Sequence, residues 1–415
     1  MTPRLIPFLP LLLAPCLALA ADNVRGDNPD ALPSTPEEER AKFHLPPGFE
    51  IQLVAAEPDI QKPLNITFDG TGRLWVTGSE MYPWPAGTDA AGLPIPGYEK
   101  AFADIASAFH VGDKAPQPTA EAHDSVRVLS DFDENGHAKT IRVFADGLNI
   151  PSGVQPLPHG SAAIAAVYGL LPNFDPNPAM QKRAPIGDRH IGQAPKGDSV
   201  IVYSIPKIWL LTDWDGDGFA ESRVPLYETA GYLDTHGGMS SFLYWIDGWI
   251  YGTHGFRNHS EIHDLNGHST LLESGNTYRF RPDGSAFEIY THGQTNPFGL
   301  TVDPFGNFYS ADSHSKPVYM LQHGGYYEGI GKQHDGLGFA PRITDDDHGS
   351  TAIAGIAYYA DDKFPEEYRG NLFNGNPRHT PHQPRQTRMA RLHSEGHPAA
   401  RFPDQRRPRG SGRYR

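Results

Sequence analysis

Cysteine is nearly absent from this sequence of 415 residues, and its absence excludes several kinds of site. The only cysteine is Cys16, which lies inside an apolar N-terminal segment. A mature chain cleaved near Ala20 would have no disulfide, no thiolate nucleophile, no cysteine metal site and no C-x-x-C-H haem attachment. The sequence also has no G-x-S-x-G elbow, Walker loop or dinucleotide glycine fingerprint in a suitable context. Serine or cysteine hydrolases and nucleotide-binding enzymes are therefore poor candidates.

The N-terminal segment, residues 1–20, predicts a secretory signal peptide. It has one basic residue, Arg4, then an apolar run and a small-residue pattern that ends at Ala20. The run is short and interrupted by proline, so we expect no transmembrane span in the mature chain. The residues before Cys16 fit a lipoprotein box poorly, so we expect no lipid anchor. These features predict a periplasmic or secreted protein.

Positive charge is scarce outside the C-terminal tail. From Arg378 to Arg415 the sequence has 10 arginines, no lysine and 2 acidic residues, which leaves 25 basic and 47 acidic residues elsewhere. The rest of the chain is therefore acidic, and negative charge disfavours nucleic acids and anionic membranes as partners of an exported protein. The tail, residues 377–415, is either a solvated basic extension or a sequence foreign to the fold, as a frameshift would produce. We favour the second interpretation, in which the preceding domain is truncated and leaves unpaired strand edges.

Long helical periodicity is also missing, and short strands take its place. The composition, 44 glycines and 39 prolines with 38% apolar residues, is typical of many short strands around a buried core. A strand, turn, strand unit recurs from about residue 45 to 376, after a flexible N-terminus at 21–44. We expect strands at Ile141–Phe144 and Ala163–Val167 in its second copy, and at Phe287–Tyr290 in its fourth. Recurrence predicts an all-β propeller with at least four blades. The turn glycines, roughly 60 to 90 residues apart, are Gly72, Gly160, Gly248, Gly306 and Gly370.

One carboxylate-rich turn could hold a metal ion. Residues 213–218 (DWDGDG) followed by an acid resemble the first half of an EF-hand loop, in which hard oxygen donors surround Ca²⁺. The predicted ligands are Asp213, Asp215, Asp217 and Glu221, although Val224 occupies the position of the usual bidentate glutamate. Residues 129–136 align with 211–218 without a gap and form a weaker copy with Asp131 and Asp133. The alternative for both is a turn in which the aspartates accept backbone N–H groups.

Histidines are frequent, and one of them has the setting of a catalytic group. His236 lies between Asp234-Thr235 and Gly237-Gly238, where the glycines would let a substrate or cofactor approach the backbone. An imidazole can serve as a general base near neutral pH. A purely structural role for His236 remains the alternative. We expect a hydrogen-bonded or solvated role, not metal ligation, for the cluster His254, His259, His263 and His268, because no helix presents two of these rings on one face.

Several segments together resemble the glucose/sorbosone dehydrogenase family of quinoprotein β-propellers. More closely, two further runs look like the exported "membrane-bound dehydrogenase" proteins of planctomycetes and verrucomicrobia. The resemblance covers about residues 45–376. The first group of segments is THGGM (235–239), WIDGWIYG (245–252), GQTNPFGL (293–300), AGIAYY (354–359) and FPEEYRGNLF (364–373), and the two further runs are SGNTYRFRPDG (274–284) and DHGSTA (347–352).

The resemblance implies a six-bladed propeller that holds pyrroloquinoline quinone and Ca²⁺ and oxidises a sugar or other alcohol. It implies that His236 is the base, that a cytochrome c accepts the electrons, and that the cofactor contacts are Asn296, Thr295, Asp312 and His348. The sequence departs from the family pattern at Thr295, where an arginine is usual, and at residues 310–315. A non-catalytic propeller that binds carbohydrate or protein is therefore the alternative function.

Overall fold

The computed structural model describes residues 34–108, 116–169, 192–228, 230–313, 318–341, 354–375 and 389–391. The predicted signal peptide, nearly all of the tail and His348 lie outside the described residues. The chain divides into two units, residues 1–42 and 43–415. In the first unit one short helix is described, α1 (Pro36–Arg40), which Thr35 and Glu38 cap reciprocally. None of the helices in the described part of the chain is long and apolar enough to cross a membrane.

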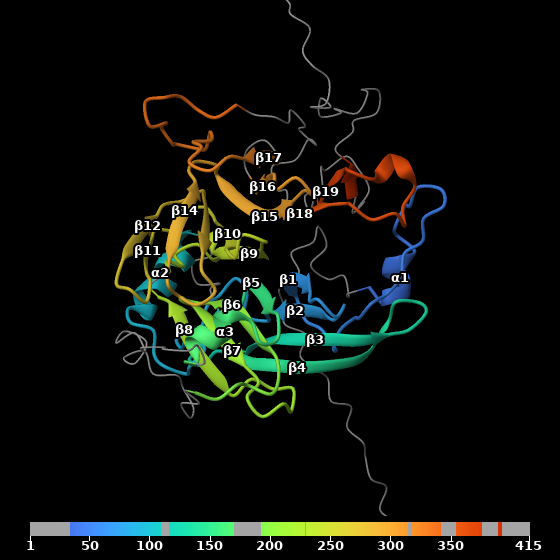
Figure 1. Ribbon diagram of the computed structural model, residues 1–415, viewed down its shortest axis with the longest axis horizontal. Coiled ribbons are helices and arrows are strands. Elements are labelled where there is room, and N and C mark those ends of the chain that lie inside the picture. Colours follow the sequence, from blue (N-terminus) through green and yellow to red (C-terminus); the bar gives the residue numbers. More distant parts are fainter. Residues whose placement is uncertain are drawn as a thin grey trace, which may run out of the picture. The chain divides into compact units, whose positions relative to one another are not determined.

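The second unit is built from antiparallel sheets in a β-propeller arrangement, which confirms the predicted all-β class and at least four blades (Figure 1). The innermost strands β1, β5, β9, β15 and β18 each contact the next one around a common centre. We call the first four sheets blades 1 to 4. Blade 1 contains β1 (Pro63–Phe68), β2 (Leu74–Gly78), β3 (Asp124–Phe132) and β4 (Ala138–Leu148), and blade 2 contains β5 (Gly153–Leu157), β6 (Ser199–Ser204), β7 (Lys207–Thr212) and β8 (Ser222–Tyr227).

The remaining sheets complete the described strands. Blade 3 contains β9 (Met239–Tyr244), β10 (Ile250–His254), β13 (Asn276–Phe280) and β14 (Phe287–Thr291), and blade 4 contains β15 (Asn296–Val302), β16 (Phe308–Ser313) and β17 (Val318–Leu321). A hairpin of β11 (Ser260–His263) and β12 (Ser269–Leu272) is inserted in blade 3. A further sheet contains β18 (Ala354–Tyr358), β19 (Leu372–Gly375) and β20 (Met389–Arg391).

The repeat was recognised correctly, but its phase was wrong. Ile141–Phe144 belongs to β4 at the outside of blade 1, and Phe287–Tyr290 belongs to β14 at the outside of blade 3. The second and fourth predicted copies therefore begin with the last strand of one blade and continue with the first strand of the next. Sequence alone cannot fix this boundary, because all neighbouring strands are antiparallel and similarly apolar. The alignment of 129–136 with 211–218 is confirmed as structural, since both connect the third and fourth strands of a blade.

The predicted strand at Ala163–Val167 was also wrong, because this segment is helix α3 (Ala162–Val167). Ser161 caps the helix by accepting the N–H of Ile164, and alanine favours helix strongly. An eleven-residue helix, α2 (Tyr98–Ala108), was missed altogether. It interrupts blade 1 between β2 and β3, and its buried residues Tyr98, Phe102 and Ile105 follow a helical spacing that is visible in the sequence.

One aspartate turn recurs in the loops and contains two of the predicted turn glycines, Gly72 and Gly306. In each turn the aspartate Oδ1 accepts the N–H groups of the second and fourth residues after it, and a glycine at the third takes a positive φ. A glycine suits that position because other residues are strained there. The turns begin at Asp69, Asp89, Asp133, Asp264 and Asp303.

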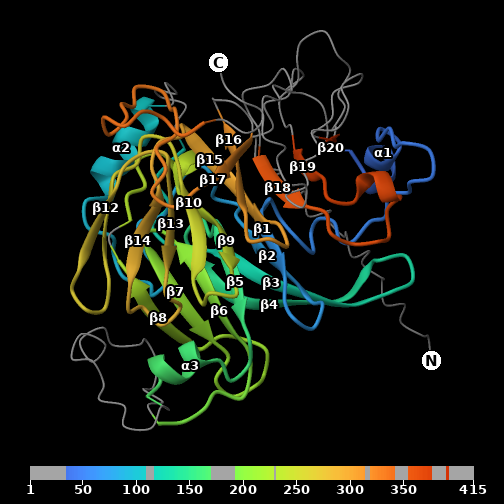
Figure 2. The same cartoon turned by 45° about the horizontal axis from the view of Figure 1, so that its top comes forward.

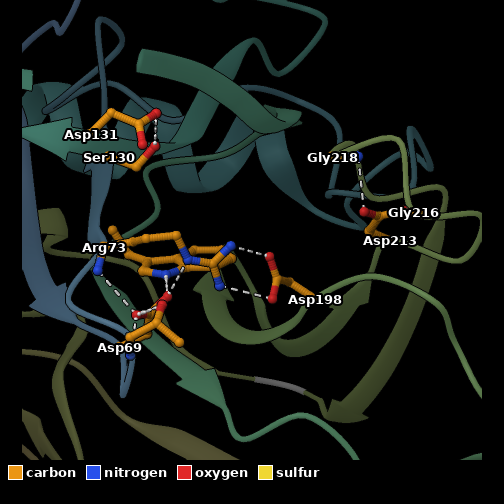
Figure 3. A network of polar contacts seen from close by, with 10 residues as sticks. Asp69, Arg73, Ser130, Asp131, Asp198, Asp213, Gly216 and Gly218 are labelled. Atoms are coloured by element: carbon orange, nitrogen blue, oxygen red, sulfur yellow. Dashed lines mark hydrogen bonds and ion pairs between the residues drawn. The ribbon is translucent and has the colours of Figure 1, made fainter. Parts of the chain in front are cut away.

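Blades 1 and 2 are joined by Arg73, which ends the first of these turns, between β1 and β2 (Figure 3). Its Nε donates to Asp69 Oδ2 at 2.7 Å, and its two Nη groups donate to the Asp198 carboxylate at 2.6 and 2.9 Å. Burial alone would raise the pKa of Asp69, but hydrogen bonds from Trp75, Thr71 and Arg73 lower it to about 2. Asp198 immediately precedes β6, so Arg73 holds the ends of two blades together.

We expect Arg73→Leu to lower the free energy of unfolding by about 1–2 kcal/mol, because it removes three charge-assisted hydrogen bonds at once. The control is Lys100→Leu, which removes an exposed ion pair with Asp104 on α2 and should change stability by less than about 0.5 kcal/mol. Denaturant unfolding of both variants measures the difference. Equal effects of the two substitutions would contradict a blade-joining role for Arg73.

Candidate functional site

His236 lies in a short 3₁₀ helix, η2 (Thr235–Gly237), immediately before the inner strand of blade 3. Asp234 Oδ1 accepts the backbone N–H of His236 at 3.0 Å and lies 3.1 Å from the imidazole Nδ1. Because a carboxylate only accepts hydrogen bonds, Nδ1 is the donor and the lone pair of the neutral ring is on Nε2. The His236 side chain is 46% exposed whereas that of Asp234 is 11% exposed. Asp234 therefore orients the ring, and nearly half of the His236 side chain is accessible to solvent.

Asp234 is itself fixed by a buried asparagine. Asn258 Oδ1 accepts the Asp234 N–H at 2.9 Å, and Asn258 Nδ2 donates to the Asp234 carbonyl at 2.7 Å. Asn258 is fully buried, so this pair of bonds is shielded from water. The Asn258–Asp234–His236 arrangement holds an imidazole in one tautomer and orientation, as a general base requires. Asp234 was not among the predicted site residues, although its place two residues before the histidine was visible in the sequence.

Asn296 contacts the segment after β10, which in turn contacts the His236 loop. Asn296 Oδ1 accepts the N–H of Phe256 at 2.9 Å, and the N–H of Gly255 donates to the carbonyl of Gly237 at 2.9 Å. A Cβ on Gly255 would lie 2.0 Å from Asn296 Oδ1 and 2.8 Å from the Gly237 Cα. Residues 255 and 256, which follow β10, therefore bridge the His236 loop and Asn296 at the start of β15.

Thr295 and Asp312 lie beneath this contact. Asp312 is fully buried, and its carboxylate oxygens accept the N–H groups of Thr295 at 2.9 Å and Asn296 at 2.6 Å. Blade 2 has the same arrangement, because Ser204 Oγ accepts the N–H of Asn149 just before β5. The geometry makes Asp312 a positioning residue for the loop, and a contact with a cofactor stays a prediction for both Thr295 and Asp312.

The predicted metal ligands lie together, but at the other end of blade 2. The ligand atoms of Asp213, Asp215, Asp217 and Glu221 are all within 4.8 Å of one another. Asp213 is buried and accepts the N–H groups of Gly216 at 2.7 Å and Gly218 at 2.9 Å (Figure 3). Its backbone pairs with Asp198 beside the Arg73 network, whereas the start of β5 faces the His236 loop through Ser152 and Met239. The length of β5 separates the two sites by about 15 Å.

The weaker copy is an ordinary turn. Asp133 Oδ1 accepts the N–H groups of Asn135 and His137, and Asp131 contacts Ser130. These hydrogen bonds match the Asx-turn alternative for this segment.

His254 is buried directly under the candidate site and is hydrogen-bonded at both nitrogens. Its Nδ1 donates to the Glu273 carbonyl at 3.3 Å, and its Nε2 accepts from Ser260 Oγ at 2.8 Å. Ser260 Oγ also accepts the N–H of Gly231. Burial lowers the pKa of His254 from 6.5 to about 4, so the ring is neutral. This confirms the hydrogen-bonded role expected for His254, and His268 likewise contacts Asp264.

We expect His254 to make stability depend on pH. In the unfolded chain the ring takes a proton near pH 6.5, but in the folded protein it resists protonation until about pH 4. The unfolded state therefore binds more protons in this window, and about 3 kcal/mol of stability is lost as pH falls from 7 to 4. Denaturant unfolding at several pH values measures the slope, which His254→Gln should flatten and the exposed His268→Gln should leave unchanged. Parallel slopes for wild type and His254→Gln would contradict this assignment.

A cavity of about 360 Å³ lies elsewhere, beside Thr88–Gly92, Gly147 and Arg223. Arg223 Nη1 donates to the Ala90 carbonyl at 2.7 Å. None of the predicted site residues lines this cavity, so it has no part in the site at His236.

Comparisons with known proteins find one family model and several solved structures. The family model described as "Domain of unknown function (DUF7133)" matches residues 35–178 and 191–386. Among solved structures, the chain is similar to a putative oxidoreductase (glucose dehydrogenase) from Thermus thermophilus, with 14% identity over 79% of this chain and 78% of that chain and a TM-score of 0.40. It is also similar to the PQQ-bound aldose sugar dehydrogenase from Streptomyces coelicolor, with 11% identity over 79% and 76% and a TM-score of 0.35. The comparison with curated proteins finds no match.

Proposed function

This chain belongs to the DUF7133 family, and we propose that it is an exported quinoprotein-type dehydrogenase that oxidises a sugar or other alcohol. The observation that carries the proposal is the geometry at His236. An imidazole oriented by a buried Asp234 stands just before the inner strand β9, and residues 255 and 256 connect its loop to Asn296. The segments THGGM (235–239) and GQTNPFGL (293–300), which resemble the glucose/sorbosone dehydrogenase family, contain His236 and Asn296.

In the proposed reaction His236 acts as the general base. Oxidation of an alcohol to a carbonyl removes one proton from the hydroxyl and one hydride from carbon. His236 Nε2 takes the proton, and Asp234 stabilises the imidazolium that forms because its carboxylate stays on Nδ1. When bound, pyrroloquinoline quinone supplies the two-electron acceptor for the hydride. A cytochrome c is the proposed acceptor for the next transfer.

The residues near Asn296 suit an anionic, planar quinone. Asn296 Nδ2 has no partner among the described residues and can donate to a quinone oxygen. Two basic residues lie close in sequence to residues that contact Asn296 and Thr295. Arg257 is next to Phe256, which donates to Asn296. Lys332 is two residues after Ile330, whose N–H donates to Thr295 Oγ1 at 3.1 Å. No ion pair is described for either cation in the described part of the chain. They would hold the cofactor's carboxylates, and His348 remains a proposed contact.

Calcium fits the Asp213 loop better than the quinone site. At the quinone site the Asp234 carboxylate holds the His236 ring, and both oxygens of Asp312 accept backbone N–H groups. In the Asp213 loop four carboxylates converge, three of them exposed and able to turn toward an ion. We propose that Ca²⁺ binds Asp213, Asp215, Asp217 and Glu221 and stiffens the β7–β8 connection, with no part in the reaction.

We propose six blades for the complete propeller, within a domain at residues 45–376 that follows a signal peptide at 1–20 and a linker at 21–44. The support is the outer face of blade 1. Ile66 and Phe68 are 61% and 63% exposed, although their cross-strand partners Val76 and Leu74 are buried on the same face by Val54, Ala55 and Ile60. An apolar strand face this exposed calls for another sheet beside it. Residues 377–415 are then a tail foreign to the fold, except that Met389–Arg391 pair with β19 as strand β20.

Cofactor reconstitution tests the proposed function. The exported chain, or a form extended by the missing blade, is mixed with pyrroloquinoline quinone and Ca²⁺, and calorimetry measures quinone binding. Reduction of an artificial electron acceptor with an aldose or polyol then measures turnover. Tight quinone binding with sugar-dependent reduction supports the dehydrogenase, and absence of quinone binding contradicts it.

The second candidate function is a non-catalytic binding module for carbohydrate or protein. Thr295 favours it, because this residue offers no positive charge and its hydroxyl already accepts the N–H of Ile330. Sugar binding without any quinone binding would establish this alternative and make His236 a structural residue.

A further inference from the structure

A segment of blade 1 crosses to blade 3 and forms one side of the His236 site. The chain leaves blade 1 after β2 and returns at β3, and the intervening residues carry α2. In Figures 1 and 2 α2 lies beside blade 3. Apolar side chains of this insertion share one core with residues of blades 2 and 3. The buried members from the insertion are Met81, Ala86, Ile95, Tyr98 and Phe102.

Tyr82, in this insertion, contacts the candidate base. The rings of Tyr82 and His236 meet edge to face with centroids 5.3 Å apart and planes at 74°. Two hydrogen bonds fix the contact. Thr235 Oγ1 donates to the Pro83 carbonyl at 2.7 Å, and the N–H of Tyr82 donates to Ser79 Oγ at 3.0 Å.

The Tyr82 side chain packs against the shared core but stays partly exposed. Met81 and Ala86 on either side of it are buried, whereas Tyr82 and Trp84 are half-exposed. The Tyr82 hydroxyl has no hydrogen-bond partner among the described residues. Burial, and then the nearby carboxylate of Asp234, raise the pKa of Tyr82, so the hydroxyl stays protonated. An amphipathic ring with an unused hydroxyl thus stands beside His236, at the point where a substrate hydroxyl must arrive.

We propose that Tyr82 is a substrate-contacting residue that selects a cyclic sugar, a pyranose, over an open-chain polyol. A pyranose has an apolar face of C–H groups and an edge of hydroxyls, which match the ring and the hydroxyl of tyrosine. Binding sites of this type combine an aromatic wall with a few polar groups. A short polyol has no comparable apolar face and gains little from the ring. This inference rests on the proposed function for the reaction, but its binding step can be measured separately.

The test uses the full chain without added quinone and measures binding by calorimetry or ligand-observed NMR. The probes are D-glucose and D-xylose as pyranoses and glycerol as the open-chain polyol. We expect Tyr82→Ala to weaken pyranose binding about tenfold, to leave glycerol binding unchanged, and to be largely rescued by Tyr82→Phe. Tyr82→Leu repeats the test with more of the side-chain volume kept, in case the alanine variant is poorly folded.

Tyr244→Ala is the matched control, because Tyr244 is a half-buried tyrosine at the far end of β9 from His236. Pyranose binding that falls equally in the Tyr82 and Tyr244 variants, or does not occur in wild type, overturns the inference. If pyranoses bind through Tyr82 but no sugar is oxidised after quinone is added, the proposed dehydrogenase fails and the inference stands.

Discussion

In a quinone-loaded form of this protein, His236→Ala and His236→Gln are expected to lower turnover by roughly 10²- to 10⁴-fold, the usual contribution of a positioned general base. The reason is that Asp234 holds Nδ1 and leaves the basic lone pair on Nε2. Quinone affinity should change little, because the ring acts on the substrate hydroxyl. Steady-state kinetics with an artificial acceptor, together with calorimetry of quinone binding, separate the two effects.

His268→Ala provides a close control for this prediction. His268 Nδ1 lies 3.1 Å from Asp264 Oδ2, the same separation as in the His236 pair, but on the β11–β12 hairpin. Its removal should leave turnover unchanged. If His268→Ala slows turnover as much as His236→Ala, the loss reflects a general effect of removing histidine–aspartate pairs and not catalysis at His236.

Recurring local chemistry made much of the fold predictable. The aspartate turns and short apolar strands recur because each blade is an antiparallel sheet whose strands are joined by tight turns. Residues 129–136 and 211–218 occupy the same connection in two blades. His236 and Asn296 could be paired from the sequence because both precede an inner strand, and inner strands of a propeller begin at the same end.

Features that depend on contacts between distant segments were not predictable. Tyr82 reaches His236 only because an insertion in blade 1 packs on blades 2 and 3, and no local pattern encodes that crossing. The separation of the Asp213 loop from His236 depends on which end of β7 carries the loop. The family resemblance implies that Asp312 is a cofactor contact, but it does not show that packing directs the buried carboxylate to two backbone N–H groups. The sequence shows which residues are polar, and packing decides which of them face the ligand.

Substitution by alanine should be destabilising at Gly237 and nearly neutral at the adjacent Gly238. A Cβ on Gly237 would lie 2.4 Å from both the backbone nitrogen and the backbone oxygen of Phe256, whereas a Cβ on Gly238 would meet nothing closer than 3.7 Å. Backbone cannot move aside as a flexible side chain can, so Gly237→Ala must shift the Phe256 segment and with it the contact to Asn296. We expect it to cost about 1–3 kcal/mol of unfolding free energy.

In the quinone-loaded protein the same displacement of His236 relative to Asn296 should lower turnover about 10²-fold for Gly237→Ala, because catalytic geometry tolerates shifts of only about 1 Å. Gly238→Ala should stay close to wild type in both measurements, since its φ of −62° suits any residue. Thermal and denaturant unfolding test the stability difference in the chain alone, without any cofactor. Equal tolerance at the two positions would contradict the close packing of the His236 and Asn296 loops on which the candidate site depends.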